Sequence, residues 1–252
     1  MISGIFHTGS GMGNQLARYV MARVLALDKG TDFGMIFPEN FKGHSFMKLD
    51  MGVPVSGLLH EYKERKEVDE FGNDIRDYDW DGLLHIKDMT LIDGEFQGEK
   101  YYTHHLDRIR EWLAVEPLDM PDDLCVIGFR GGEYVGVRDL FLPQEYWDKA
   151  IAMMREKHPN IRFEVHTDDV ITAQSFFPDF KVIHNIGLNW RSVRYAKHLI
   201  IANSSFFILP ALLGQAKEII APRFWAGYNR RTQQLLQNVY EGFSYIHHED
   251  IG

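Results

Sequence analysis

The chain has 252 residues, of which 45% are apolar and 25% charged, a composition typical of a globular protein with one large or two small domains. Its formal net charge of −9 argues against a surface that coats nucleic acid, because such binding depends on clustered lysine and arginine. The single cysteine, Cys125, excludes an internal disulfide and fits a reducing compartment.

Neither a secretion signal nor a membrane segment is predicted. The first 13 residues contain no basic residue before a short apolar run, which is not the pattern of a signal peptide. The most apolar stretch, residues 199–213, is interrupted by Asn203 and Pro210 and is shorter than the roughly 20 residues that a membrane helix needs. We therefore expect a soluble, cytoplasmic protein with no integral membrane segment.

The N-terminal residues predict a strand, a glycine-rich turn and a helix. Residues 2–6 are mostly apolar, residues 7–13 form the glycine-rich turn, and Asn14 is a candidate N-cap for a helix that continues to Leu27. Such a turn directs backbone N–H groups toward a ligand above the sheet, which suits an anion or the hydroxyls of a sugar. A tight connection between strand and helix, with no ligand, has the same pattern.

Residues 31–123 contain both apolar and polar stretches. Residues 61–81 are rich in lysine, glutamate and aspartate, which is typical of a solvated helix face and loop. Residues 117–123 combine proline with aspartate and predict a domain boundary. The other elements expected here are strands at residues 33–37 and 89–93 and a helix near residues 106–113.

Residues 124–129 are an apolar run that ends in Arg130, Gly131 and Gly132. Such a run is typical of a strand that is buried on both faces of a parallel sheet. An arginine at the carboxyl end of a strand can hold a phosphate or carboxylate through two parallel hydrogen bonds, and ligands of open α/β sheets bind at that end. A structural ion pair beside an ordinary turn would show the same pattern.

From this strand onward, apolar runs alternate with amphipathic segments. This alternation predicts an α/β fold with a doubly wound parallel sheet. Further strands are expected at residues 161–166, 181–184, 199–202 and 218–221, and helices at residues 143–158, after 167–169, at 193–198 with Ser192 as cap, at 206–213 and at 232–240.

Several short motifs occur in a fixed order along the chain. They are GMGNQL at residues 11–16, DGEFQGEKY at 93–101, RGGEY at 130–134, HTDD at 166–169, IANSSF at 201–206 and IIAP at 219–222, with Tyr19 and Trp225 beside the first and the last. In this order they resemble the α-1,2-fucosyltransferase family and, more distantly, the protein O-fucosyltransferases. The similarity covers most of the chain.

The resemblance implies a GT-B-like fold of two facing Rossmann-type domains. Residues 1–117 would form an acceptor-side α/β domain, and residues 118–252 a C-terminal, nucleotide-sugar-binding domain. The implied reaction transfers L-fucose from GDP-fucose to a hydroxyl of an acceptor glycan, α-1,2 to galactose, with inversion. The implied partners are the nucleotide sugar and the acceptor glycan, with no nucleic acid, no metal ion and no cofactor besides the donor substrate.

The chemistry of this reaction points to particular residues. A diphosphate that leaves a sugar gains negative charge, which without a metal ion must be stabilised by arginine and by preorganised N–H or hydroxyl donors. Arg130 is the candidate cation and residues 203–206 the candidate donors; the alternative for residues 203–206 is a plain helix cap. Asp168 or Asp169 can accept from the N1–H and the amine of guanine, unless the two residues only stabilise the helix that they open.

The resemblance also places Asn14 and Gln15 toward the sugar and the acceptor, with His7, Glu95 and Gln97 beside them. The candidate catalytic residues are Arg130, Asn14 and Glu133, and the candidate binding residues are Gly11, Gly13, Gln15, Arg130, Thr167, Asp168, Asp169, Asn203, Ser204, Ser205 and Phe206.

The chain departs from the family pattern at several positions. Gly128 and Gly131 stand where the family has a histidine and a second arginine, and Ile208 and Leu209 stand where tryptophans are usual. Glu133 replaces an aspartate and lies near the position of a general base. The missing arginine removes either a phosphate contact or a structural ion pair.

Three other functions fit parts of the sequence. Residues 77–79, with Asp77 and Asp79, spell the Asp-x-Asp motif of a metal-dependent GT-A glycosyltransferase, but no apolar strand precedes them. The glycine-rich turn and Asp32 resemble a nicotinamide-dinucleotide fingerprint that lacks its third glycine. A non-catalytic GDP-sugar-binding protein would also account for the altered motifs. The histidines show no metal-binding spacing, and His104 and His105 are interpreted as a surface pair.

Overall fold

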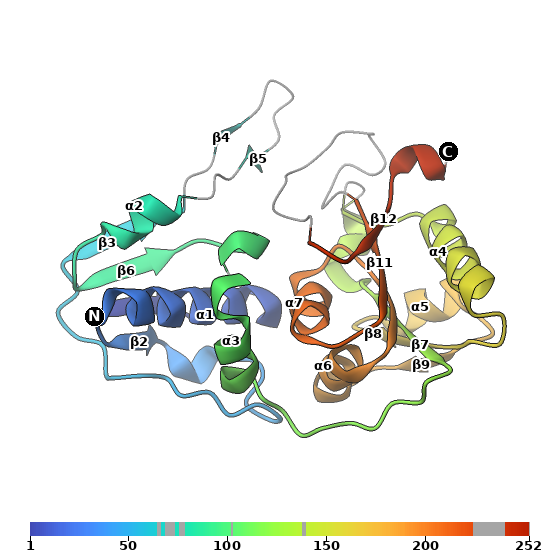
Figure 1. Cartoon of the computed structure of the whole chain (residues 1–252), viewed down its shortest axis with the longest axis horizontal. Helices are drawn as coiled ribbons and strands as arrows, with labels where there is room; N and C mark the ends of the chain where they lie inside the picture. The colour runs from blue at the N-terminus through green and yellow to red at the C-terminus, as the bar shows by residue number, and fades with distance from the viewer. Residues whose placement is uncertain are drawn as a thin grey trace. The chain divides into compact units, whose positions relative to one another are not determined.

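The computed structural model describes residues 1–64, 67–68, 74–75, 79–101, 103–137, 140–223 and 240–251. The chain divides into two compact units, unit 1 (Met1–Val115) and unit 2 (Glu116–Gly252), and each contains an open parallel sheet (Figure 1). The α/β class predicted from the sequence is confirmed. Among the described residues, no helix combines the length and the apolar character needed to cross a membrane.

Unit 1 has a four-stranded sheet with the order β2-β1-β6-β3, in which all pairs are parallel. Helix α1 packs against β1, β2 and β6. The elements are β1 (Ile2–Ile5), α1 (Met12–Lys29), β2 (Phe33–Ile36), β3 (His60–Lys63), the antiparallel pair β4 (Glu67–Val68) and β5 (Asp74–Ile75), α2 (Trp80–Leu84), β6 (Thr90–Asp93) and α3 (Leu106–Trp112).

Helix α1 begins at Met12, three residues before the predicted start. Gly11 occupies the N-cap position in an extended conformation, so the prediction of Asn14 as the N-cap is wrong. At the other end, Gly30 has a φ of 62° and donates its N–H to Ala26 O and Leu27 O. This left-handed residue closes the helix, as glycine commonly does.

The prediction of a solvated helix face at the start of the polar segment is also wrong. Residues 60–63 form strand β3, which pairs in parallel with β6 from His60 opposite Thr90 to Lys63 opposite Asp93. β3 is the last strand of the sheet and is largely exposed. An edge strand tolerates charged side chains on both faces, which explains why no apolar alternation is visible in the sequence.

Unit 2 has a six-stranded parallel sheet with the order β12-β11-β10-β7-β8-β9. Numbered from the first strand of this unit, the order is 6-5-4-1-2-3, that of the Rossmann fold. Helices lie on both sides of the sheet, α4 and α5 on one side and α6 and α7 on the other (Figure 1). The elements are β7 (Leu124–Phe129), α4 (Gln144–Lys157), β8 (Arg162–Thr167), α5 (Val170–Phe176), β9 (Lys181–Ile183), α6 (Ile186–Tyr195), β10 (His198–Ile201), α7 (Ser205–Leu213), β11 (Glu218–Pro222) and β12 (Ser244–Ile246).

All five strands predicted for this unit are present, and β12 is a sixth that was not predicted. The prediction of a helix at 193–198 with Ser192 as its cap is wrong in both bounds, because the helix observed here is α6 (Ile186–Tyr195). α6 begins after Asn185, whose side chain accepts the N–H of Leu188 at 2.8 Å, and it ends before His198, which opens β10. The predicted helix at 232–240 and Trp225 lie outside the described residues, apart from Tyr240.

The core of unit 2 fixes the end of the central strand. Phe129, the last residue of β7, is fully buried among four aromatic rings whose centroids lie between 5.3 and 6.0 Å from its own. The hydroxyl of Tyr146 on α4 donates to Ile201 O at 2.7 Å, which fixes the end of β10. Both strand ends that carry the candidate site are therefore anchored in the core.

Candidate functional site

The carboxyl ends of β7 and β10 lie side by side at the centre of the unit 2 sheet. Gly128 pairs with Ile201, and the N–H of Ala202 donates to Gly128 O at 2.8 Å. After β7 the sheet continues with β8 on one side, and after β10 it continues with β11 on the other. We call this place the switch point, because ligands of open α/β sheets bind where the strand order reverses. It brings residues 130–132 and 203–206 to one edge.

Arg130 follows β7 directly, and two carboxylates hold its guanidinium. Nη1 lies 2.5 Å from Asp168 Oδ2, and Nη2 pairs with Glu133 Oε1. The buried Nε has no hydrogen-bond partner among the described residues, and the guanidinium carbon lies 5.1 Å from the centre of the Tyr134 ring. The Glu133 side chain is 72% exposed and that of Asp168 30%. A phosphate would replace Glu133 more readily, because an exposed ion pair contributes only about 0–1 kcal/mol.

Asp168 and Asp169 brace the loop after β7 from the neighbouring strand. Asp168 Oδ1 accepts the N–H of Gly131 at 2.9 Å, and Asp169 Oδ2 accepts that of Gly132 at 3.3 Å. Asp169 also caps α5 by accepting the N–H of Thr172 at 3.1 Å and its hydroxyl at 2.6 Å. These bonds, the Thr172 hydroxyl first, lower the pKa of Asp169. The structure thus gives Asp169 the helix-capping role that was the alternative to guanine recognition.

The end of β8 is fixed by segments that follow it in the chain. The main-chain carbonyl of Thr167 accepts from Asn189 Nδ2 at 2.9 Å and bonds His184 Nδ1 at 3.1 Å. The fully buried His166 ring bonds Asn189 Oδ1 and Glu164 Oε1, both at 3.0 Å. This network, together with the buried Thr167, positions the two aspartates that follow.

Residues 203–206 form the other half of the switch point. Ser204 is the N-cap of α7, but its hydroxyl makes no capping hydrogen bond. Asn203 is 2% exposed and donates Nδ2 to Leu140 O at 2.9 Å, so it positions the turn. Ser205 is the first residue of α7, and the N–H groups of Phe207 and Ile208 both donate to Ser204 O at 2.9 Å, so the carbonyl of Ser204 closes the first turn. Phe206 is half-buried, with its ring 5.8 Å from that of Trp190.

Two glycines at which the sequence departs from the motifs that it resembles have a steric explanation. A Cβ atom at Gly128 would lie 2.8 Å from ring carbons of Phe207. A Cβ atom at Gly131 would lie 2.6 Å from the Cβ of Asp169. Larger residues at these positions would displace Phe207 or Asp169, so the switch point of this chain is built without the histidine and the second arginine.

A second polar cluster lies at the carboxyl edge of the unit 1 sheet, where β1 and β6 are neighbours. Asp93, the last residue of β6, accepts from His7 Nε2 at 3.2 Å and lies 3.4 Å from Arg18 Nε. Arg18 is 8% exposed and donates to Ser10 Oγ at 2.9 Å. The glycine-rich turn is therefore tied to the end of β6 through a nearly buried arginine.

Asn14 and Gln15 have different surroundings although they are neighbours in α1. Asn14 Oδ1 accepts from Gln97 Nε2 at 2.8 Å, which joins two of the predicted motifs. Gln15 is fully buried, donates to Asn40 O at 2.8 Å and accepts the N–H of Lys42 at 3.0 Å. Gln15 thus holds the segment after β2, and its polar atoms face the protein. Gly11 and Gly13 lie at the start of the same helix.

Glu64 is an organising residue that sequence reasoning missed. It is 6% exposed, and its Oε2 accepts the N–H groups of Glu95 at 2.7 Å and Phe96 at 3.2 Å. Phe96 has a φ of 44°, a left-handed conformation that is strained for a bulky residue and needs such support. Glu64 lies in a run of charged residues, so the sequence offers no signal that distinguishes it. Arg18 could have been noticed in the sequence, because it is a cation among the apolar residues of α1.

The Asp-x-Asp motif of the rival GT-A interpretation is only partly described. Asp79 caps α2, and its Oδ1 accepts the N–H of Gly82 at 3.0 Å. Asp77 lies outside the described residues. Asp32, of the dinucleotide interpretation, is exposed.

The two polar edges, one in each unit, are the candidate binding sites among the described residues. Comparison with protein-family models and with curated proteins finds no match to the chain.

Proposed function

We propose that the chain is a glycosyltransferase that moves L-fucose from GDP-fucose to a hydroxyl of an acceptor glycan, with inversion. In this proposal the nucleotide binds at the switch point of unit 2, the fold is GT-B-like, and the transfer needs no metal ion. The observation that carries the proposal is that Arg130 and the start of α7 lie at the carboxyl ends of two adjacent strands in a sheet with Rossmann strand order.

The leaving diphosphate determines what the site must do. Negative charge grows on it as the bond to fucose breaks, and preorganised donors stabilise that charge. Arg130 supplies a fixed cation, because Asp168 holds one side of the guanidinium while the exposed Glu133 can give way to phosphate. The hydroxyl of Ser204 supplies a further donor, and the positive end of the α7 dipole lies beside it.

Asp168 and Asp169 act in this proposal as positioning residues, because they hold the loop that carries Arg130. Glu133, once phosphate has displaced it, is an exposed carboxylate and the candidate to take the proton of the acceptor hydroxyl; because that hydroxyl attacks from the face opposite the leaving group, Glu133 would have to turn toward that face. The edge of unit 1 offers amide and imidazole groups, from Asn14, Gln97 and His7, that suit the hydroxyls of a sugar.

One observation favours a second function, a GDP-sugar-binding protein without transferase activity. Arg130 is paired with two carboxylates, so the charge that it offers to a diphosphate is largely balanced. Such a protein would bind GDP-fucose and leave it intact.

A thermal-unfolding panel with GDP, GDP-fucose, a UDP-sugar and NAD tests the proposal. Arg130→Ala is compared with Arg162→Ala, a matched control in the same unit, whose exposed guanidinium pairs with Asp123 at 2.8 Å. GDP at 100 times its dissociation constant should stabilise the wild type and the control by about 2.7 kcal/mol without added metal. Arg130→Ala should lose this effect, and GDP-fucose should then be turned over with an acceptor glycan.

Each other result has a defined meaning. Equal protection of Arg130→Ala and wild type would remove Arg130 from the nucleotide site. Protection by NAD or UDP-sugar alone would refute GDP-fucose as donor, and protection that needs added Mn²⁺ would favour the GT-A alternative. Binding of GDP-fucose without transfer or hydrolysis would identify the second function.

A further inference from the structure

Three potential metal ligands converge at the amino edge of the unit 2 sheet, the edge opposite the switch point. His198 opens β10 and Glu218 opens β11, and the two residues are direct partners in the parallel register. Their side chains therefore leave the same face of the sheet. His158, the C-cap of α4, reaches them from the helix. One ligand atom from each residue lies within 4.8 Å of those of the other two.

The histidine in the middle of this cluster lacks a complete set of partners. His198 is 6% exposed, and no described residue lies within hydrogen-bond distance of its buried Nδ1, although the backbone of Asp122 interacts with the ring. Its ring centroid lies 4.3 Å from that of His158, whose Nε2 bonds Glu218 Oε2 at 2.9 Å. A buried ring nitrogen without a partner costs free energy that a bound ion would recover.

We propose that His158, His198 and Glu218 form a binding site for a divalent transition-metal ion of the zinc class. Two imidazole nitrogens and one carboxylate oxygen are ligands that Zn²⁺ prefers, and three protein ligands leave one position open. Metal–ligand bonds of about 2.0–2.1 Å in a tetrahedral site place neighbouring ligand atoms roughly 3.3 Å apart. His158 Nε2 and Glu218 Oε2 are 2.9 Å apart, and no two of the three ligand atoms are more than 4.8 Å apart. Small side-chain shifts would therefore bring all three to the separation that a bound ion needs.

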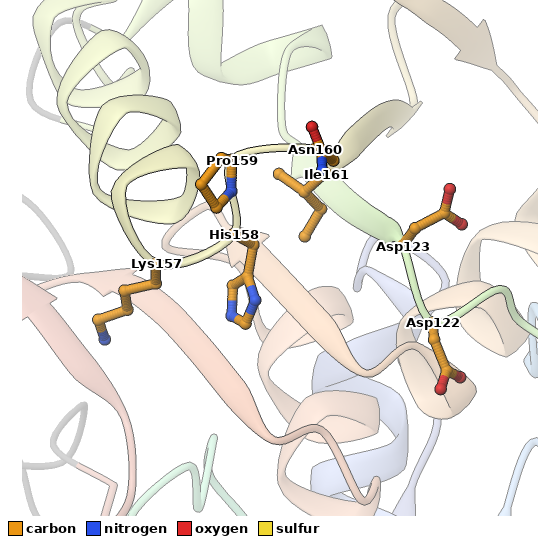
Figure 2. Close-up of a pocket in the computed structure, with 7 residues that line it drawn as sticks. All are labelled: Asp122, Asp123, Lys157, His158, Pro159, Asn160 and Ile161. Atoms are coloured by element: carbon orange, nitrogen blue, oxygen red, sulfur yellow. The ribbon is translucent and has the colours of Figure 1, made fainter.

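A pocket beside the cluster gives an ion access from solvent. It has a volume of about 350 Å³, and His158 lines it together with Lys157, Asp122 and Asp123 (Figure 2). The two aspartates pair with Lys197 and Arg162, so their charges are largely balanced and the pocket offers a route to the cluster rather than an attraction for the ion. Figure 2 shows His158 directed from the end of α4 toward the strands, while both aspartates lie across the pocket from it.

Lys157 is the group that an ion would have to replace. Its ammonium pairs with the other oxygen of Glu218, but its side chain is 51% exposed and flexible, whereas that of Glu218 is 12% exposed. The ion would tie the end of α4 to the starts of β10 and β11. Since the unfolded chain has no such site, binding would stabilise the folded unit.

The chain offers a matched control cluster in unit 1. There Asp28 accepts from His105 Nε2 at 2.5 Å and from His104 Nε2 at 3.2 Å, so one carboxylate satisfies both rings. This cluster also brings three ligand atoms within 4.8 Å, and a metal titration must separate it from the first.

The test is a titration of the chelator-treated, metal-free chain with Zn²⁺ by calorimetry and with Co²⁺ by visible absorption. The wild type should bind one tight ion, with a Co²⁺ spectrum of nitrogen and oxygen ligands. His158→Gln and Glu218→Gln should each weaken binding by at least about 100-fold, since loss of a direct ligand exceeds the loss of an outer partner. A double variant, His104→Gln with His105→Gln, should retain the tight site. Lys157→Met should bind more tightly than wild type because the competing ammonium is gone.

Circular dichroism of each metal-free variant verifies the fold; the His158 side chain is 39% exposed, so its replacement should be tolerated. The proposal is overturned if the wild type binds no ion in excess Zn²⁺, if both cluster variants keep wild-type affinity, or if the tight site disappears with His104 and His105. Unchanged or weaker binding by Lys157→Met would also contradict the assigned oxygen ligand.

Discussion

A single methyl group at Gly131 tests whether Asp169 braces the loop that carries Arg130. In Gly131→Ala the new Cβ would lie 2.6 Å from the Cβ of Asp169 and 2.9 Å from its Oδ2. Gly131 has a φ of −105°, which does not require glycine, so the cost comes from overlap with the neighbouring side chain. Asp169 must move, and overpacking of this kind costs about 1–3 kcal/mol of stability. Weakening of the cap on α5 adds to this loss.

The assay is urea unfolding followed by the fluorescence of the buried Trp147 and Trp190, both in unit 2. The control is Gly136→Ala in the same loop, where a Cβ meets no atom within 4 Å. We expect Gly131→Ala to lower the free energy of unfolding by about 1–3 kcal/mol, and the control to leave it nearly unchanged. GDP affinity should fall in Gly131→Ala alone. If the two variants unfold at the same urea concentration, Asp169 does not brace this loop, and the account of the missing arginine is wrong.

Three further predictions follow from contacts near the switch point. Ser204→Ala should leave the midpoint of urea unfolding unchanged, because the hydroxyl makes no capping bond. It should lower the rate of transfer by roughly 100- to 1,000-fold, and a wild-type steady-state rate would remove this donor from the mechanism. Tyr146→Phe removes the bond to Ile201 O and should cost about 0.5–1.5 kcal/mol in the same urea assay, whereas an equal or more stable variant would show that the end of β10 is held by packing alone. The hydrogen bond from His166, followed by that from Lys181, lowers the pKa of Glu164 from 4.5 to about 2, so its stabilising effect is complete above pH 4.5 and is lost as the pH falls toward 2. The stability difference between wild type and Glu164→Gln should therefore shrink over that range, and a difference that does not change with pH would contradict the assignment.

The strands of unit 2 were predictable because burial on both faces of a parallel sheet requires continuous apolar runs. β7 is the clearest case, with every residue buried. β3 was not predictable because edge strands tolerate charge. The start of α6 was misjudged because Ser192, which lies inside the helix, was taken as its cap in place of Asn185. β12 is as short as β9 but contains a single aliphatic residue, Ile246, whereas β9 contains Val182 and Ile183.

The sequence predicted which strand ends meet at the candidate site, but not which side chains contact one another there. A parallel sheet brings strand ends to one edge, so Arg130 and residues 203–206 could be expected together. The pairing of Arg130 with Asp168 depends on tertiary packing between β7 and β8, as does the contact of Glu64 with the loop after β6. The metal cluster was missed for a related reason, because spacing rules detect ligands on one element, whereas His158, His198 and Glu218 come from three.

The strand order of unit 2 has a consequence for biosynthesis. β7, with Arg130 at its end, is the first strand of this unit to leave the ribosome, but its neighbour β10 is encoded roughly seventy residues later, after β8 and β9. Until β10 and α7 have emerged, one whole flank of β7 has no hydrogen-bonding neighbour and the serine donors do not exist. Any fragment that stops short of β10 will therefore leave one edge of the central strand open to aggregation, and the proposed nucleotide site is incomplete until α7 has also been made.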